Sequence, residues 1–400
     1  MVGFPLGNAL LCSPVMDIKS QTLEEVRAQL QRWGEPSYRV PQLLDWVYVH
    51  RATEWEAMSS LPKKLRDLLQ GYYSLLSLEL VRKQGSRDET QKFLWRLKDH
   101  SLIESVLIPA SPALYGEPSD RHTLCVSTQV GCAYGCKFCA SGLEGWKRNL
   151  TVEEIIEQLL AVERWNDERE DERPGDSQVE DQATAVTNLG GRVSRTSKPS
   201  RLVSNLVIMG MGEPLANYDN LLKALKILNA SWGGRIGARK ITISTSGLVP
   251  QIRKLADEPL QFRLAISLHG ATDQVRNKIM PVNRKYPLDE LTAACEYYQK
   301  AKGRMITFEY ILIAGVNDRL EQVKPLAALA RRLNAKVNLI PYNNVEGLSW
   351  ERPDEAAQDA FLEALQEEKV SATLRREKGR DIDAACGQLR LKTERELAAR

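Results

Sequence analysis

The sequence predicts an α/β protein, organised as a partial (β/α)6 barrel with a small N-terminal helical domain. Two observations predict this class. Short runs rich in Val and Ile alternate with helix-length amphipathic segments through the middle of the chain, as in a parallel sheet covered by helices. Six such runs are too few for a closed eight-stranded barrel, so we expect an open barrel with reactive groups at the carboxyl ends of its strands.

The N-terminal part is expected to span residues 21–110, after a tail at residues 1–20. Three segments have the apolar spacing of amphipathic helices: QTLEEVRAQLQRWG, QLLDWVYVHR and LPKKLRDLLQGYYSLL. The stretches KFLWRL and LIESVLIP alternate as strands do and predict a strand pair. The tail has neither the basic start nor the long apolar region of a signal peptide.

The barrel is expected over residues 111–349, followed by a C-terminal segment at residues 350–400. Its strand-like runs are HTLCVST, LVSNLVIM, KITIS, FRLAISL, MITFEYILI and KVNLIP. Its helix-like segments are LTVEEIIEQLLAVERW, DNLLKALKILNA, LDELTAACEYYQKA and LEQVKPLAALARRLN. Residues 166–201 interrupt this alternation, because they are polar, charged and poor in aliphatic side chains. Such a stretch cannot bury enough apolar surface to order itself, so we expect a flexible insertion.

Composition points to an ordinary globular protein, with 43% hydrophobic and 27% charged residues. No apolar run reaches the roughly 20 residues that span a membrane, so we expect no membrane association. The seven cysteines favour a reducing compartment, and therefore the cytoplasm. The net charge of +3 is compatible with an anionic partner. The sequence has four basic stretches: Lys147–Arg148, residues 235–240, Arg284–Lys285, and Arg375–Arg376 with Lys378 and Arg380. Each could contact such a partner or lie on a solvated surface.

The segment GCAYGCKFCASG places Cys132, Cys136 and Cys139 within eight positions. This C-x3-C-x2-C spacing lets three thiolates converge on one point. Structural zinc sites use four ligands, usually as two separated pairs, and the sequence has neither a second such cysteine pair nor paired histidines. A four-iron cluster on three cysteines would keep one iron open, as catalysis requires. Buried structural cysteines, a distorted zinc site and an iron–sulfur electron carrier remain alternatives.

With this motif the sequence resembles the radical S-adenosylmethionine (SAM) enzymes, and among them the RlmN-type RNA adenine C2 methyltransferases. The matching segments are TLCVSTQVGC, MGMGEPL, ITISTSGLVP, SLHG, MPVNRKYPL, VNLIPYN and GRDIDAACGQL. The N-terminal segments YRVPQLLDWVY and LPKKLRD also match. The resemblance covers the chain apart from residues 166–201 and the first twenty. It implies the radical SAM version of the partial barrel.

The resemblance implies one [4Fe-4S] cluster on Cys132, Cys136 and Cys139, with SAM on the open iron. In MGMGEP the alternative of a dinucleotide-binding G-x-G-x-x-G fails, because Leu215 stands where the third glycine belongs. The Glu213 carboxylate is instead implied to accept hydrogen bonds from the SAM ammonium group. The residues implied to bind SAM are Gly212, Glu213, Ser244, Ser267, Leu268, His269 and Asn343.

The resemblance also implies roles for three residues outside that set. Cys386, in DIDAACGQL, would take a methyl group from one SAM by thiolate attack, and a second SAM would provide the radical that activates this methyl group for addition to adenine C2. Cys125 would resolve the resulting protein–RNA link, leaving a Cys125–Cys386 disulfide. Glu104 would be the proton acceptor. Taken alone, Cys125 would be a buried strand cysteine and Glu104 a solvated strand glutamate. Cys12 and Cys295 match nothing in the family.

The implied substrates are adenine 2503 of 23S ribosomal RNA and also adenine 37 of transfer RNA, with the base flipped out of its stack. The N-terminal helical part would contact RNA through Arg39, Lys63, Lys64 and Arg66. The implied partners are an electron donor such as flavodoxin or ferredoxin and a thiol reductant, and we expect a monomer. Methylation at adenine C8, as in Cfr-type resistance enzymes, is the alternative, although the QVGC and GEPL segments favour C2.

Overall fold

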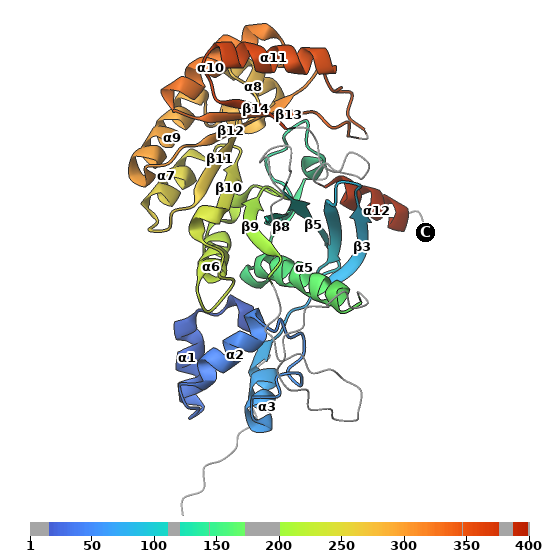
Figure 1. Cartoon of the computed structure of the whole chain (residues 1–400), viewed down its shortest axis with the longest axis vertical. Helices are drawn as coiled ribbons and strands as arrows, with labels where there is room; N and C mark the ends of the chain where they lie inside the picture. Colours follow the sequence, from blue (N-terminus) through green and yellow to red (C-terminus); the bar gives the residue numbers. More distant parts are fainter. Residues whose placement is uncertain are drawn as a thin grey trace, which may run out of the picture. The chain divides into compact units, whose positions relative to one another are not determined.

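The structure is a computed structural model that describes residues 16–110, 121–143, 145–172, 201–345, 347–375 and 387–398. The chain divides into two compact units, Met1–Ser77 and Leu78–Arg400, whose elements are labelled in Figure 1.

Between residues 16 and 77 the first unit contains three helices, as its apolar spacing predicts: α1 (Leu23–Arg32), α2 (Arg39–Tyr48) and α3 (Lys63–Tyr72). Helix α1 begins with a capping box, in which Thr22 and Glu25 each accept a hydrogen bond from the other's backbone N–H. The end of the expected tail is ordered, because β1 (Met16–Asp17) pairs with β2 (Tyr73–Ser74) and the 3-10 turn η1 (Ile18–Ser20) follows.

The second unit is built on one ten-stranded sheet, in the order β14-β13-β12-β11-β10-β9-β6-β5-β4-β3. The sheet does not close, since β3 and β14 lie at its two ends, and an open α/β barrel is therefore confirmed. The parallel strands are β6 (His122–Cys125), β9 (Val203–Ile208), β10 (Ile241–Thr245), β11 (Arg263–Ser267), β12 (Thr307–Leu312), β13 (Lys336–Pro341) and β14 (Ala372–Leu374). The first six are those that the sequence predicts, and β14 adds a seventh.

Three antiparallel strands extend this sheet: β3 (Glu79–Gly85), β4 (Gln91–Arg96) and β5 (Leu102–Pro109). The sequence predicts β4 and β5 as a strand pair of the N-terminal part, with a boundary at residue 110. In the structure β5 pairs with β6, with Val106 opposite Cys125, and the division lies after Ser77 instead. A strand pair by itself cannot bury its apolar face, and here it does so as part of the larger sheet.

Helices cover the sheet of the second unit. They are α5 (Val152–Glu172), α6 (Tyr218–Asn229), α7 (Val249–Asp257), α8 (Asp273–Ile279), α9 (Leu288–Lys302), α10 (Val323–Arg332), α11 (Glu355–Glu367) and α12 (Gln388–Ala398). Because α5 continues through Glu172, residues 166–172 of the expected insertion are helical, while residues 173–200 lie outside the described part. No helix in the described ranges is long and apolar enough to cross a membrane.

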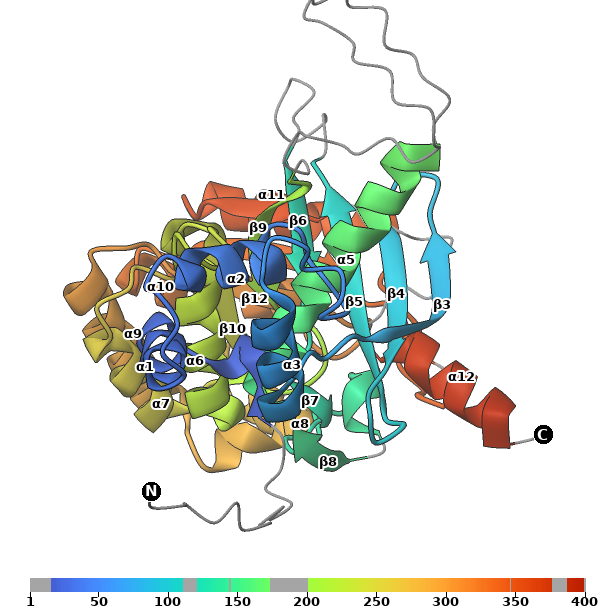
Figure 2. The ribbon, with the colours of Figure 1, turned by 90° about the horizontal axis from the view of Figure 1, so that it is seen from below.

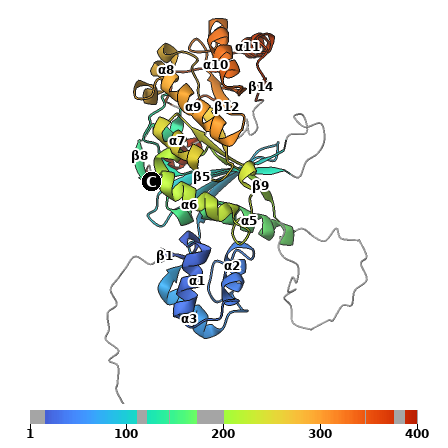
Figure 3. The ribbon, with the colours of Figure 1, turned by 90° about the vertical axis from the view of Figure 1, so that its left-hand side faces the viewer.

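Helix α12 lies apart from the helices that follow the parallel strands. It lies beside β3 and β4 in Figures 1 and 2, whereas Figure 3 shows α7, α9 and α10 together along the opposite part of the sheet. Leu389 of α12 packs against Leu94 and Leu102, and Glu396 forms an ion pair with Arg82 at 2.6 Å. The C-terminal segment is thereby fixed to the antiparallel strands.

Candidate active site

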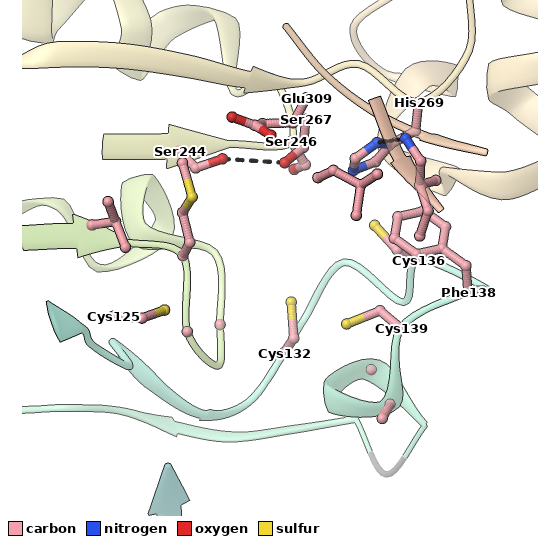
Figure 4. A pocket seen from close by; sticks show the side chains of 18 of the residues that line it. Cys125, Cys132, Cys136, Phe138, Cys139, Ser244, Ser246, Ser267, His269 and Glu309 are labelled. Atoms are coloured by element: carbon pink, nitrogen blue, oxygen red, sulfur yellow. Dashed lines mark hydrogen bonds between the residues drawn. The ribbon is translucent and has the colours of Figure 1, made fainter. Parts of the chain in front are cut away.

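A cavity of about 360 Å³ opens at the carboxyl ends of the parallel strands (Figure 4). Its size is at the lower end of the range for small-molecule sites. It brings together all the site residues expected from the sequence except Glu104, Leu268 and Cys386: Cys125, Cys132, Cys136, Cys139, Gly212, Glu213, Ser244, Ser267, His269 and Asn343. Cys386 lies outside the described residues.

The cysteine loop is shaped by the strands β7 (Gln129–Gly131) and β8 (Trp146–Asn149). Gly131 has a positive φ of 75°, and a Cβ atom there would lie 2.0 Å from the Gly145 carbonyl oxygen. Cys132 N–H donates to that oxygen at 3.0 Å, and Cys139 N–H donates to the Cys136 carbonyl at 3.0 Å. Glycine is therefore required where the loop turns toward the cavity.

The three thiols of the loop surround one open space (Figure 4). Burial raises the pKa of Cys132 to about 12 and raises the pKa of Cys136 well above its usual value. Thiolates here therefore need a bound cation, and three sulfur donors suit iron–sulfur clusters. Among the described residues no three His, Cys, Asp or Glu side chains are already arranged around one metal position, so binding requires the thiols to turn toward one another.

The cavity wall also carries buried hydroxyls that the sequence analysis did not single out. The side-chain oxygens of Ser246 and Tyr342 have no hydrogen-bond partner within the described residues. Both residues line the cavity. Ser246 is two positions after Ser244 in ISTSG, and Tyr342 directly precedes Asn343 in PYN, so the same motifs contain both residues. Unpaired buried hydroxyls at a cavity wall fit a polar ligand.

Glu213 is held firmly at this wall. One carboxylate oxygen accepts from Ser246 N at 2.7 Å and the other from Leu215 N at 3.1 Å. The Glu213 N–H donates to the Gln129 side-chain oxygen at 2.8 Å. Burial raises the pKa of Glu213, since its side chain is only 3% exposed. A buried carboxylate fixed in this way is suited to accept from a cationic group.

The ends of β10 and β11 bring further polar groups to the cavity. The Ser244 and Ser267 hydroxyls lie 3.2 Å apart. The His269 Nδ1 accepts from Ile311 N at 3.0 Å, and burial lowers the pKa of His269 to about 3. The ring is therefore neutral and carries its proton on Nε2. Leu268 is buried and does not line the cavity.

Arg276 of α8 organises these strand ends, although the sequence analysis did not identify it. Its guanidinium is fully buried and donates to the carbonyls of Leu268 at 2.6 Å, Ser267 at 3.2 Å and Ser246. Its Nε donates to the Asn283 side-chain oxygen at 2.8 Å. One side chain thus fixes the loops after both β10 and β11.

Glu104 lies on β5 and is not among the residues that line the cavity. Its carboxylate accepts from Gly387 N and from Arg390 N, each at 2.7 Å, at the beginning of α12. It also forms an ion pair with Lys92 at 3.0 Å, and both side chains are almost fully buried. Gly387 lies so close to Ser141 that a Cβ atom would meet the Ser141 hydroxyl oxygen at 2.7 Å. The residue that follows Cys386 is therefore held beside the cysteine loop.

The basic stretch Lys147–Arg148, which follows the cysteine loop, is neutralised within the fold. Arg148 forms ion pairs of 2.7 Å with both Asp99 and Glu154, and Lys147 lies 3.6 Å from Glu394. The charge of Arg148 is thus balanced by two carboxylates within the fold, whereas Lys147 stays half exposed.

Sequence comparisons match both units. A sequence model of the radical SAM superfamily matches residues 199–327. A model described as the ribosomal RNA large subunit methyltransferase N-terminal domain matches residues 16–74, which fall within the first unit.

Known proteins are similar over almost the whole chain. The chain is 54% identical over 379 residues to the probable dual-specificity RNA methyltransferase RlmN 3 of Opitutus terrae. The matched residues make up 95% of each of the two chains. The chain is 48% identical over 387 residues to the probable dual-specificity RNA methyltransferase RlmN of Akkermansia muciniphila, covering 97% of this chain and 99% of that one. A crystal structure of a radical SAM methyltransferase from Sphaerobacter thermophilus has a TM-score of 0.80 and 40% identity, covering 93% of this chain and 98% of that one.

Proposed function

The chain belongs to the RlmN family of dual-specificity RNA methyltransferases in the radical SAM superfamily, and on this premise we propose that it methylates C2 of adenine in RNA. The proposed substrates are adenine 2503 of 23S ribosomal RNA and adenine 37 of transfer RNA. The observation that carries the proposal is the Glu104 contact with Gly387, because it fixes the residue next to Cys386 beside the cysteine loop.

Membership of the radical SAM superfamily implies a [4Fe-4S] cluster and SAM. We propose that Cys132, Cys136 and Cys139 hold the cluster, which is supported by their shared cavity and the sulfur donor set. When bound, the cluster and SAM supply one-electron chemistry that thiols and carboxylates do not. The proposed SAM-binding residues are Gly212, Glu213, Ser244, Ser267, Leu268, His269 and Asn343.

The chain's own residues carry the methyl group and move the proton. The Cys386 thiolate attacks the methyl carbon of a first SAM, and a second SAM is used in the same turnover. The Cys386 methyl group would lose one hydrogen atom to a radical derived from the second SAM, and its carbon would then bond to adenine C2. Glu104 would accept the proton that C2 loses, and the remaining electron would return to the cluster. The Cys125 thiol attacks the Cys386 sulfur, which releases methylated RNA and leaves a disulfide. The position of Cys125 in the cavity supports this role.

A thiol reductant must open that disulfide, and an electron donor such as flavodoxin or ferredoxin must reduce the cluster. We therefore place the reaction in a reducing cytoplasm, with the protein acting as a monomer. The first unit would hold RNA phosphates through Lys63 and Lys64, which are exposed at the start of α3. Arg39 and Arg66, which were expected beside them, also hydrogen-bond within the unit.

The test is an anaerobic reaction of the reconstituted full chain with SAM, a reductant and a 23S ribosomal RNA fragment. The RNA is digested to nucleosides and compared with 2-methyladenosine and 8-methyladenosine standards. We expect 2-methyladenosine. An 8-methyladenosine product would move the protein to the Cfr-type reaction, and SAM cleavage without a methylated adenosine would overturn the proposed substrate.

A further inference from the structure

A second cavity, of about 900 Å³, lies at the opposite ends of the strands. Its lining includes residues from the first halves of six parallel strands, β6 and β9 to β13, together with Leu374 and Arg375 at the carboxyl end of β14. The interiors of such barrels are usually filled by branched apolar side chains. Here polar side chains make up part of the lining instead: Thr123, Asn205, Thr242, Thr307, Lys336 and Asn338.

The lining of this second cavity is strongly cationic. It contains one carboxylate, that of Glu309, and six cationic side chains: Arg121, Lys240, Arg263, Arg304, Lys336 and Arg375. Burial raises the pKa of Glu309, and this favours its neutral form. The cavity therefore carries a large excess of positive charge.

Four of these cations form no close ion pair within the described residues, although Lys336 and Arg375 lie near enough to Glu309 to lower its pKa against the effect of burial. Lys240, Arg263, Lys336 and Arg375 form no ion pair with any residue in the described ranges. Arg331 and Arg332 at the end of α10 each form an ion pair of 2.7 Å instead, with Glu368 and Glu296. Unpaired cations gathered on one concave surface attract anions more strongly than an evenly charged surface does.

The cationic cavity and the cysteine cavity share part of their walls. Both are lined by Ile108, Val207, Met209, Glu309 and Arg375. A ligand that enters between the cations therefore meets the same wall that leads to the cysteine loop.

We propose that this cationic cavity is the entrance for RNA, where its cations hold the phosphodiester backbone while the target base passes along the shared wall. The inference rests on the proposed function, in that RNA is the substrate. The cations come from separate places, including the turn before β10 and the first residues of β11 and β13. Charges spread over a large cavity suit consecutive phosphates better than a single small anion.

The test is RNA binding by the full chain carrying Lys240→Gln, Arg263→Gln and Lys336→Gln together. A matched control carries Lys278→Gln, Lys300→Gln and Lys324→Gln, which remove the same charge from exposed positions on α8, α9 and α10. Affinity for a labelled RNA hairpin with an unpaired adenine is measured at several salt concentrations. We expect the cavity variant to bind this RNA more weakly than the unmodified protein does. The slope of log affinity against log salt should be smaller in magnitude for this variant, by about 2 to 3. The control should change the slope by less than about 1.

SAM cleavage without RNA is measured in parallel and should be the same in the cavity variant, the control and the unmodified protein. Equal salt slopes for the two variants would overturn the inference. This result is separate from the proposed function, which fails if the unmodified protein makes no methylated adenosine. A cavity variant that loses RNA affinity but retains SAM cleavage supports the entrance whichever carbon is methylated.

Discussion

Glu104 on β5 accepts a hydrogen bond at 2.7 Å from the backbone N–H of Gly387, a residue 283 positions further along the chain. The same carboxylate accepts from Arg390 N and pairs with Lys92. It therefore stabilises the beginning of α12. The backbone N–H groups there have no acceptor within the helix, and these groups and the helix dipole favour a negative charge. Glu104 is thus a positioning residue for the segment next to Cys386, and its role as proton acceptor stays a prediction.

Replacing Glu104 by Gln should loosen α12. The change removes the charge while keeping the size, and it breaks the buried ion pair with Lys92. Breaking a buried ion pair in this way costs about 3–5 kcal/mol of unfolding free energy. Urea unfolding measures this loss, and hydrogen exchange should be faster at the Gly387 and Arg390 amides.

The control for this pair is Glu79→Gln, which breaks the exposed ion pair with Arg96 and should cost no more than about 1 kcal/mol. A second variant, Lys92→Met with Glu104→Gln, should recover part of the loss, because both charges of the buried ion pair are then removed together. Unchanged exchange at Gly387 in Glu104→Gln would contradict the positioning role.

Arg276→Met should weaken SAM binding. The loss of its guanidinium leaves the carbonyls of Ser246, Ser267 and Leu268 without their donor, at about 1.5–3 kcal/mol for each hydrogen bond to a charged group. Equilibrium dialysis with SAM should show at least about a tenfold weaker affinity. Arg253→Met, an exposed arginine on α7, is the matched control. Equal SAM affinity in the two variants would contradict the role of Arg276 in positioning the loops that bind SAM.

His269 should make the stability depend on pH below 6.5. Its pKa in the folded protein is about 3, and the unfolded chain has the usual value of about 6.5. Between these values the unfolded chain binds a proton that the folded protein does not. The stability present above pH 6.5 is therefore lost as pH falls toward 3, at about 1.4 kcal/mol per pH unit. Urea unfolding at pH 7, 6 and 5 should show a steeper loss for the unmodified protein than for His269→Gln; parallel curves would refute this assignment.

The two proposed thiol roles give opposite results with RNA. Cys386→Ala should form no methylated adenosine, because it removes the methyl carrier. Cys125→Ala should accumulate protein covalently bound to RNA, because the link then has no resolving thiol. Denaturing gels with labelled RNA detect the link. Cys295→Ala, a buried thiol on α9 outside the cavity, is the control and should retain activity. Methylated product from Cys386→Ala, or no linked species with Cys125→Ala, would contradict these roles.

The sequence by itself determined the barrel strands, most of the helices and the cysteine loop. These features depend on residues close together in the chain. Apolar spacing sets which face of a segment is buried, and Cys132, Cys136 and Cys139 fall within eight positions. Short motifs also indicated the polar site residues that follow successive strands, such as Ser244 and Ser267. The parallel sheet brings these residues to one cavity.

Only the tertiary structure decided what joins distant segments. Local alternation indicates that β4 and β5 are strands, but hydrogen bonds to β6 decide that they extend the barrel sheet. The same holds for Glu104 at the start of α12 and for Arg276 between two strand ends. These contacts depend on strand register and on side chains that meet across the fold, and no local pattern encodes such partners.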